Sequence, residues 1–272
     1  MRRILGCLSR GRYYLTNELP LQLVADREKL QAVEQSIPTT VYQTWEDRYF
    51  GKTHARELEK FRDINPELSF VIFDQQQLGA YMAEHWGEHP IHRIFANVRF
   101  GPMRADIFRY CILFERGGYY FDINKACTTP LTALHPRDAS ALISYEGSDC
   151  IVLPDDEAMG RMQHPDKIVC QWGLAFAPGH PVLARMIDNI CHHYDYFRNR
   201  SFSFPKSAIL AFTGPGMFTK TVREAFSAGD HAGVAQAGID FNGSGIPRLN
   251  GSKVRYLTVP AYAAARNAVI VT

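Results

Sequence analysis

The fold is decided in residues 101–124, which read GPMRADIFRYCILFERGGYYFDIN. Pro102 suits the first turn of a helix, and the double glycine at 117–118 suits the end of one. The residues that follow, 119–123, are mostly aromatic and are typical of a strand. The stretch therefore predicts a helix over 102–116 that turns directly into a strand.

Four polar residues stand at regular places in this stretch. Asp106 and Arg109 are three residues apart on the expected helix, so they share one face of it. Asp122 and Asn124 are two residues apart at the end of the expected strand, so its alternation points both to one side. Two oxygen ligands on one side suit a hard cation such as Mg²⁺ or Mn²⁺, which also binds substrate phosphates. The pattern predicts a metal site at Asp122 and Asn124, with Asp106 and Arg109 free to hydrogen-bond a sugar or phosphate.

The rest of the chain alternates short strands with longer helices. Strands are expected near 39–45, 68–73, 141–145 and 174–176, and helices near 20–35, 53–64, 75–86, 181–196 and 216–226. Such alternation predicts an α/β fold with a mainly parallel central sheet flanked by helices. No Gly- or Pro-rich linker divides the 272 residues. We therefore expect one domain over 37–272, preceded by an N-terminal helical or tail segment over 1–36.

Charge and composition exclude several classes of protein. The net charge of +2, from 30 Lys and Arg against 28 Asp and Glu, is too balanced for a dedicated nucleic-acid binder. A hydrophobic content of 46% excludes a wholly disordered chain. No window approaches the ~18 continuous apolar residues of a membrane helix, so we expect a cytoplasmic protein. The six cysteines form no C-x-x-C pair, which indicates free thiols in a reducing compartment.

The N-terminus carries a cluster of basic residues, namely Arg2, Arg3, Arg10 and Arg12. One interpretation is a solvated tail. The other is an electrostatic contact with an anionic membrane, which would place the protein peripherally at the inner membrane surface. Both interpretations stay open.

Three histidines, His85, His89 and His92, have a spacing that could form a metal-binding helix face. Pro90 interrupts that helix, because proline lacks the backbone donor and clashes with the preceding turn. The sequence therefore favours ordinary surface histidines over a second metal site.

The central motif resembles glycosyltransferase family 32. Residues 105–110 and 117–124 are similar to the family pattern A-D-x-x-R-Y followed by G-G-x-Y-x-D-x-D. Residues 37–45 resemble the family's opening strand, and 65–70, 176–181 and 213–215 resemble later elements, so that the resemblance spans roughly residues 37–220. The family includes yeast initiating mannosyltransferases and bacterial capsule and lipopolysaccharide sugar transferases, and its motif is similar to that of the clostridial glucosylating toxins.

The resemblance implies a GT-A fold that binds a nucleotide-sugar donor and retains the anomeric configuration. By position, Trp45 would stack on the nucleotide base, with Gln43 and Thr44 beside it. Asp106 and Arg109 would hold the donor sugar and, with Asp122, form the catalytic centre.

The resemblance also implies residues that would contact the metal, the donor diphosphate and the acceptor. Asp122 and the residue at 124 would hold Mn²⁺ or Mg²⁺ in the manner of the family. Gly214, at the start of a helix, would offer backbone amides to the diphosphate, with an ordinary loop as the alternative. Gln171 and Trp172 would line either the acceptor side of the site or the core.

Two departures from the family pattern affect the metal site. Asn124 replaces the family's second aspartate, and an amide oxygen ligates without negative charge, so the affinity for metal should fall. Tyr42 replaces the histidine of the opening strand. The third metal ligand has four candidates, which no motif separates: His231, Asp240, Asn242 and Ser244.

The sequence therefore predicts a retaining, metal-dependent glycosyltransferase. It would move a hexose from a nucleotide-diphosphate sugar, first a UDP-sugar and second GDP-mannose, to a glycan or lipid-linked saccharide, as in capsule or lipopolysaccharide synthesis. One alternative is a nucleotide-sugar-binding protein with weak or lost catalysis, which Asn124 favours. The other is a non-catalytic α/β interaction module in which the Asp106–Arg109 pair is structural. No nucleic-acid partner is expected.

Overall fold

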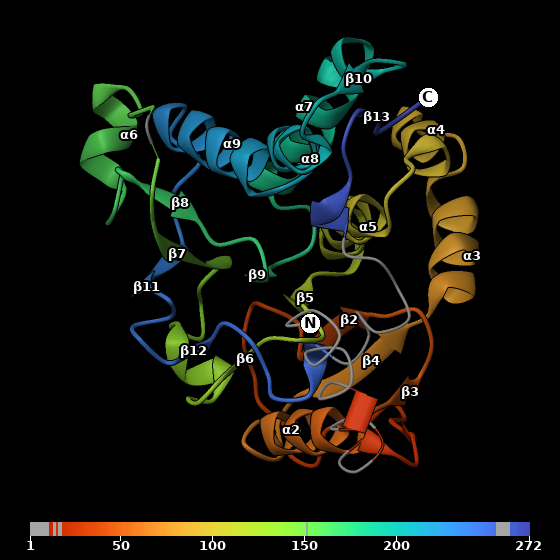
Figure 1. Ribbon diagram of the computed structural model, residues 1–272. Helices are drawn as coiled ribbons and strands as arrows, with labels where there is room; N and C mark the ends of the chain where they lie inside the picture. Colours follow the sequence, from red (N-terminus) through yellow and green to blue (C-terminus); the bar gives the residue numbers. More distant parts are fainter. Residues whose placement is uncertain (1–10, 13–14, 16–17, 151, 254–261) are drawn as a thin grey trace.

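The computed structural model describes residues 11–12, 15, 18–150, 152–253 and 262–272 (Figure 1). Its main helices are α2 (Lys52–Asp63), α3 (Gln75–Trp86), α4 (Pro90–Asn97), α5 (Gly101–Arg116), α6 (Asp156–Arg161), α7 (Pro181–Phe197), α8 (Pro205–Phe212) and α9 (Pro215–Ser227). The central sheet has the order β11 (Val234–Ile239), β7 (Ala141–Asp149), β9 (Gly173–Phe176), β5 (Gly118–Phe121), β2 (Thr40–Thr44) and β4 (Ser69–Phe73), with β8 (Lys167–Val169) on β7. Two-stranded pairs join β1 (Gln22–Leu23) to β3 (Tyr49–Phe50), β6 (Ala126–Cys127) to β12 (Gly245–Ile246) and β10 (Ser201–Phe202) to β13 (Ala268–Val269).

Most strands of the central sheet run in one direction. β2 is parallel to both β4 and β5, and β11 is parallel to β7. β9 is antiparallel to its neighbours β5 and β7, and β8 is antiparallel to β7. β4, β2, β5, β7 and β11 therefore share a direction, which confirms the predicted α/β fold with a mainly parallel sheet.

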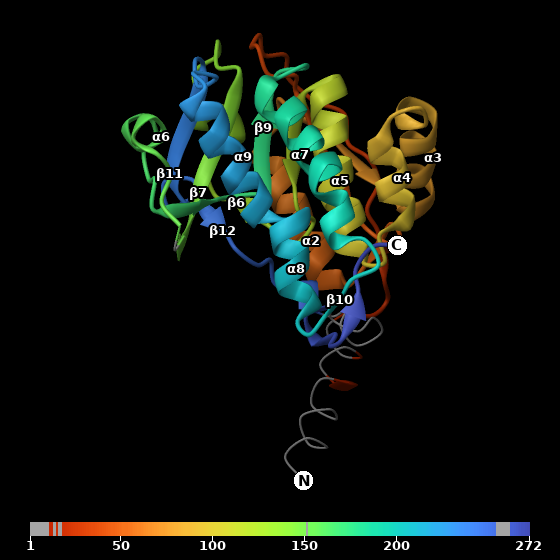
Figure 2. The same ribbon diagram turned by 90° about the horizontal axis from the view of Figure 1, so that it is seen from above.

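Helices cover both faces of the sheet, because residues along each strand alternate between two cores. Tyr42 and Tyr120 join the core formed with α3, α4, α5, α7, α8 and α9, whereas Val41, Tyr119 and Phe121 join the core formed with α2. In Figure 1, α2 lies on one side of the sheet and α5 and α7 to α9 lie on the other. Figure 2 shows α5, α7, α8 and α9 gathered over that same face.

The double glycine turns α5 directly into β5, as predicted. Gly117 and Gly118 have φ angles of 64° and 102°, a region that residues with a Cβ rarely adopt. A Cβ at Gly118 would also lie 2.6 Å from the carbonyl oxygen of Thr40 on the neighbouring strand. The second glycine is therefore required both by its backbone conformation and by the close approach of β2.

The predicted helix near 20–35 is wrong. This segment is extended, and Arg27 exchanges backbone hydrogen bonds of 2.9 and 2.7 Å with Phe70 in β4. β1 pairs with β3 through Leu23 and Tyr49. Pairing with an existing sheet edge thus outweighs the helical preference of the local sequence. The division of the chain at residues 36 and 37 stays a prediction.

Two predictions about thiols and membranes can be compared with the described residues. Cys111, Cys127, Cys150, Cys170 and Cys191 are free thiols, as predicted, and Cys7 lies outside the described residues. Within the described ranges, no helix is long and apolar enough to cross a membrane. Of the four N-terminal arginines, only Arg12 is among the described residues, and their membrane interpretation stays a prediction.

Candidate functional site

The ends of the parallel strands meet at one edge of the sheet, which we call the carboxyl edge. Ligands of open α/β sheets bind outside this edge. It gathers Trp45 after β2, Asp122 after β5, Glu146 within β7, Gln171 and Trp172 before β9, and Asp240 after β11. Most of the polar residues singled out in the sequence therefore lie at one edge.

Arg109 lies at the centre of an ionic network on this edge. Its Nη2 is 3.1 Å from Oδ1 of Asp106 and donates a 2.9 Å hydrogen bond to Oδ1 of Asp122. The side chains of Arg109 and Asp106 are 4% and 8% exposed, whereas that of Asp122 is 33% exposed. One guanidinium thus joins a buried carboxylate to a carboxylate that solvent can reach.

The remaining contacts of Arg109 fix its orientation. Nη1 donates to the carbonyl oxygen of Gln171 at 2.5 Å, and the guanidinium carbon lies 4.3 Å from the ring centre of Tyr120. The hydroxyl of Tyr120 is in turn 2.8 Å from Oγ1 of Thr44. Burial alone would lower the pKa of Arg109, but Asp122, Tyr120 and Asp106 raise it, so the guanidinium stays charged.

Asp106 is held by protein groups from distant parts of the chain. Its Oδ2 accepts a 2.9 Å hydrogen bond from Oγ1 of Thr213, and its Oδ1 accepts a 3.1 Å hydrogen bond from Nε2 of Gln171. Burial raises the pKa of Asp106 to about 7, against the lowering effect of Arg109. In this structure Asp106 ties α5 to the segment before β9 and to the loop before α9. Its role toward a donor sugar stays a prediction.

Three further residues of this network, Tyr110, Gln171 and Thr213, are joined by hydrogen bonds that the sequence did not predict. The hydroxyl of Tyr110 donates to the carbonyl oxygen of Thr213 at 3.0 Å and also contacts Nε2 of Gln171. Gln171 is 6% exposed and Thr213 is fully buried. The motif contained Tyr110, but nothing in it indicated partners that lie 61 to 103 residues away.

The prediction that Asp122 and Asn124 alternate along a strand is wrong. β5 ends at Phe121, although the amide of Asp122 still donates to the carbonyl oxygen of Trp172 at 2.8 Å, in register with β9. A turn follows, in which the amide of Lys125 donates to the carbonyl oxygen of Asp122 at 2.8 Å. The two predicted metal ligands therefore lie in a turn at the carboxyl edge, where backbone curvature and not strand period sets their directions.

The side chain of Asn124 has a buried oxygen, Oδ1, that accepts no hydrogen bond from the described residues. A buried acceptor without a partner costs about 1–3 kcal/mol. Together with the partly exposed carboxylate of Asp122, this oxygen fits a Mg²⁺ or Mn²⁺ ion that takes its other ligands from phosphates and water.

Among the described residues, no group of three His, Cys, Asp or Glu side chains is arranged to hold a metal. The histidines at 85, 89 and 92 therefore form no such group.

The candidates for a third metal ligand separate by position. Asp240, Asn242 and Ser244 follow β11 at the carboxyl edge, and the carbonyl oxygen of Ser244 accepts a 2.9 Å hydrogen bond from the amide of Thr128. His231 precedes β11 and packs on Phe226, with ring centres 5.9 Å apart. Since six residues of strand span ~20 Å, His231 lies at the opposite edge and is not a ligand for this site.

The residues predicted to bind the nucleotide lie at the end of β2. Trp45 stacks on Phe50 with ring centres 5.6 Å apart, and its ring meets His54 edge-on at 5.9 Å. Gln43 is fully buried, and neither its Nε2 nor its Oε1 has a partner among the described residues. Thr44 links to Arg109 through Tyr120. Their contact with a base stays a prediction.

The remaining predicted residues lie beside the network. Gly214 precedes α9, and its amide donates to the carbonyl oxygen of Ile209 at 3.0 Å. Trp172 is 7% exposed and packs on Phe241, while the ammonium of Lys125 lies 5.0 Å from its ring centre. The diphosphate contact of Gly214 and the acceptor contact of Trp172 stay predictions.

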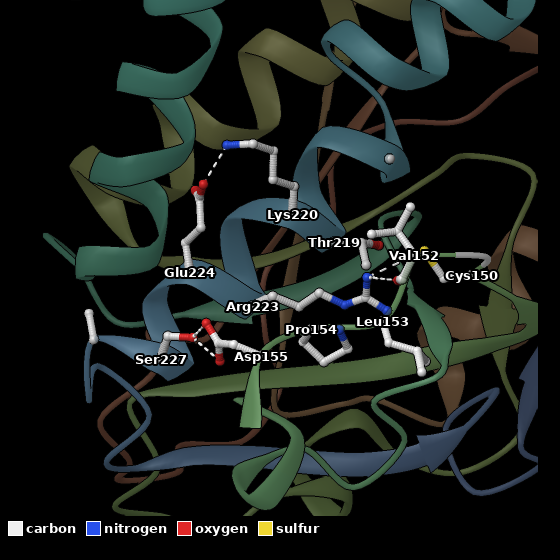
Figure 3. A pocket seen from close by; sticks show the side chains of 12 residues that line it. Cys150, Val152, Leu153, Pro154, Asp155, Thr219, Lys220, Arg223, Glu224 and Ser227 are labelled. Atoms are coloured by element: carbon white, nitrogen blue, oxygen red, sulfur yellow. Dashed lines mark hydrogen bonds and ion pairs between the residues drawn. The ribbon is translucent and has the colours of Figure 1, made fainter. Parts of the chain in front are cut away.

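A cavity of about 800 Å³ lies along α9, away from the Arg109 network (Figure 3). Residues 150 and 152–155 form one wall, with Val152 and Leu153 72% and 56% exposed, and α9 forms the other. Figure 3 shows Arg223 reaching from α9 to the backbone of Val152, which it contacts by a hydrogen bond. None of the ionic residues at the carboxyl edge lines this cavity, so we place the candidate site at the Arg109 network.

The segment that contains most of this network matches a known protein family. Residues 51–141, which contain Asp106, Arg109, Asp122 and Asn124, match the family described as "Glycosyltransferase sugar-binding region containing DXD motif". The initiation-specific alpha-1,6-mannosyltransferase of Schizosaccharomyces pombe is 26% identical over 197 residues, covering 69% of this chain and 48% of that protein.

Two further curated relatives are also named mannosyltransferases. The same-named enzyme of Candida albicans is 26% identical over 230 residues, covering 77% of this chain and 57% of that protein. The inositol phosphoceramide mannosyltransferase 3 of S. pombe is 23% identical, covering 74% and 49%. The chain thus spans about half the length of these curated relatives. A solved structure, the PaToxG glycosyltransferase, matches 82% of this chain and 79% of its own with a TM-score of 0.48 and 13% identity. Residues 51–141 are thus similar to glycosyltransferases whose sugar-binding region contains a DXD motif, in agreement with the resemblance found in the sequence.

Proposed function

We propose that the protein is a glycosyltransferase that moves a mannosyl residue from a nucleotide-diphosphate sugar to an acceptor hydroxyl, with retention of configuration. The observation that carries this proposal is the Asp106–Arg109–Asp122 network at the carboxyl edge, inside the segment that matches the family. The names of the relatives favour a mannosyl donor over the UDP-sugar expected first from the sequence.

Asp122 and Asn124 would hold the divalent cation. The partnerless Oδ1 of Asn124 and the partly exposed carboxylate of Asp122 supply two oxygen ligands. A bound Mg²⁺ or Mn²⁺ would neutralise charge on the leaving diphosphate. Arg109 would keep the Asp122 carboxylate in one orientation, because its guanidinium is itself fixed by Asp106 and Gln171.

The donor would lie along the edge from β2 to β5. Trp45 would pack against the base, and Asp122 would face the diphosphate and sugar. The bond between the anomeric carbon and the phosphate oxygen breaks, the bond to the acceptor oxygen forms, and the acceptor proton passes to the leaving phosphate. Since the site draws on residues from 43 to 240, we also propose that residues 37–272 form one domain.

The acceptor is a saccharide or a lipid-linked saccharide in this proposal. The names of the relatives include transfer to inositol phosphoceramide, which is a lipid, and an alpha-1,6-linkage. Capsule and lipopolysaccharide synthesis, expected from the sequence, has no support among these yeast enzymes. A cytoplasmic location and a peripheral membrane contact stay predictions.

A donor screen tests the proposal. The protein is incubated with GDP-mannose, UDP-glucose or UDP-galactose, with Mn²⁺ or with EDTA, and the released nucleoside diphosphate is measured. We expect release from GDP-mannose that depends on Mn²⁺. The absence of release from every donor, with and without mannoside acceptors, would contradict a transferase.

A second candidate is a nucleotide-sugar-binding protein with weak catalysis. Two observations favour it: Asn124 stands in place of a carboxylate, and the charge of Asp122 is paired with Arg109. This candidate predicts Mn²⁺-dependent donor binding in calorimetry without release of the diphosphate. The transferase predicts both.

A further inference from the structure

Glu146 is a carboxylate at the carboxyl edge that the proposed donor site does not use. It lies in β7, where the pairing with β8 is irregular: Tyr145 faces Val169 and Asp149 faces Lys167. Three residues of β7, 146–148, therefore oppose the single Ile168. Such a bulge bends the strand and redirects its side chains, and bulges are common beside active sites. The side chain of Glu146 is thus placed by a local distortion of the sheet.

Backbone hydrogen bonds place Glu146 between two other segments of the site. The carbonyl oxygen of Tyr145 accepts from the amide of Asp240 at 2.7 Å, and that of Ser144 accepts from the amide of Cys170 at 2.8 Å. The segment after Cys170 leads to Trp172, whose carbonyl oxygen binds the amide of Asp122. Glu146 therefore lies beside the turn after β11 and beside the segment that anchors the predicted metal turn.

The turn on the β11 side of Glu146 has a strained backbone. Asp240, Phe241 and Asn242 have φ angles of 45°, 54° and 56°, a left-handed run without glycine. Such conformations cost of order 1 kcal/mol or more for each residue and gather at functional sites. The strained backbone of this turn is consistent with a functional site beside Glu146.

The charges around Glu146 come from three segments. Burial raises the pKa of Glu146, Lys125 lowers it, and Asp240 and Asp122 raise it. Glu146 is only partly buried, and it has no side-chain hydrogen bond or ion pair with the described residues. Its carboxylate is thus available to a ligand.

The sheet order separates Glu146 from the nucleotide side. Trp45 follows β2, which neighbours β5 and Asp122, whereas Glu146 is on β7, two strands away from β5 on the other side. With ~4.8 Å between strands, Glu146 lies ~10 Å from β5 along the edge, opposite to Trp45. A donor with its base at Trp45 and its diphosphate at Asp122 would point its sugar toward Glu146.

We propose that Glu146 binds the acceptor, its carboxylate accepting hydrogen bonds from the hydroxyl groups of an acceptor sugar. Ionised carboxylates accept strong hydrogen bonds from hydroxyls, and they lose that strength on conversion to an amide. Asp240 and the edge of the Lys125–Trp172 pair flank this position. The inference rests on the proposed transferase function and names a residue for its second substrate.

The test compares wild type with Glu146→Gln and Glu146→Ala, and with Glu157→Gln as a control for loss of an exposed carboxylate elsewhere. GDP-mannose with Mn²⁺ is the donor, and methyl α-D-mannopyranoside is the acceptor probe. We expect the acceptor KM of Glu146→Gln to rise about tenfold or more, the scale of a hydrogen bond to a charged group, while its donor KM stays at the wild-type value. Glu157→Gln should match wild type in both.

The outcomes separate this inference from the proposed function. An unchanged acceptor KM in both Glu146 variants overturns the inference, and so does a changed donor KM or Mn²⁺ requirement, which would place Glu146 on the donor side. A wild type that releases no diphosphate overturns the proposed function. In that case calorimetry of methyl α-D-mannopyranoside with GDP and Mn²⁺ still judges Glu146: equal binding by wild type and Glu146→Gln overturns it, and loss in the variant alone supports it.

Discussion

Substitution Arg109→Lys separates the charge of Arg109 from its shape. The guanidinium serves Asp106, Asp122 and the carbonyl oxygen of Gln171 at the same time, with both carboxylates within 3.1 Å of Nη2. A lysine ammonium keeps the charge but lacks the planar fork, so at least one of these acceptors loses its donor. A hydrogen bond to a charged group contributes about 1.5–3 kcal/mol, and we therefore expect the free energy of unfolding to fall by about that amount for the one donor lost.

The assay is urea unfolding followed by tryptophan fluorescence, with Arg27→Lys as the matched control. Arg27 pairs with Asp63 at 2.7 Å, but these side chains are 25% and 64% exposed. Exposed ion pairs contribute about 0–1 kcal/mol, so the control should lose little stability. An Arg109→Lys protein within about 0.5 kcal/mol of wild type would refute the argument that the buried network depends on the shape of the guanidinium.

Three other predictions concern the same edge of the sheet. Burial raises the pKa of Asp106 from 3.8 to about 7, so its contribution to the free energy of unfolding should fall as pH rises from about 4 to 7 and stay constant above. Asp106→Asn should remove this dependence on pH in unfolding measurements across that range. Asn124→Asp adds a carboxylate, and the dissociation constant for Mn²⁺ in calorimetry should fall; an unchanged constant would argue against ligation at this position. Gly118→Ala should lower the thermal midpoint strongly, since the left-handed backbone costs about 1–2 kcal/mol and the added Cβ would meet the carbonyl oxygen of Thr40 at 2.6 Å; a midpoint like that of wild type would remove the steric argument.

The local parts of the site were predictable from the sequence, and the long-range parts were not. The spacing of Asp106 and Arg109 and the glycines at 117–118 act within one turn of chain, where helix geometry and φ preferences decide the outcome. Asp106 is hydrogen-bonded by Gln171, 65 residues away in the sequence, and by Thr213, 107 residues away. Only the order of the strands brings these residues together.

The errors have two physical origins, a local turn and long-range strand pairing. The strand was expected to continue through Asp122, but a turn begins there, closed by the hydrogen bond from the amide of Lys125 to the carbonyl oxygen of Asp122. The segment around Arg27 was expected to be helical, but it pairs with Phe70. No local sequence pattern indicates Glu146, because the bulge that places it depends on the register of β7 against β8. A local turn ends the strand before Asp122, whereas tertiary pairing or strand register overrides the local preference at Arg27 and Glu146.

The measurement that tests the central claim most directly is diphosphate release from GDP-mannose with Mn²⁺ by wild type, Asp122→Ala and the control Asp138→Ala. Asp122 belongs to the network, whereas Asp138 is an exposed aspartate outside it. We predict release by wild type and Asp138→Ala, and none by an Asp122→Ala protein whose circular dichroism matches that of wild type. Near-normal release by Asp122→Ala would contradict the assignment of this network as the active site.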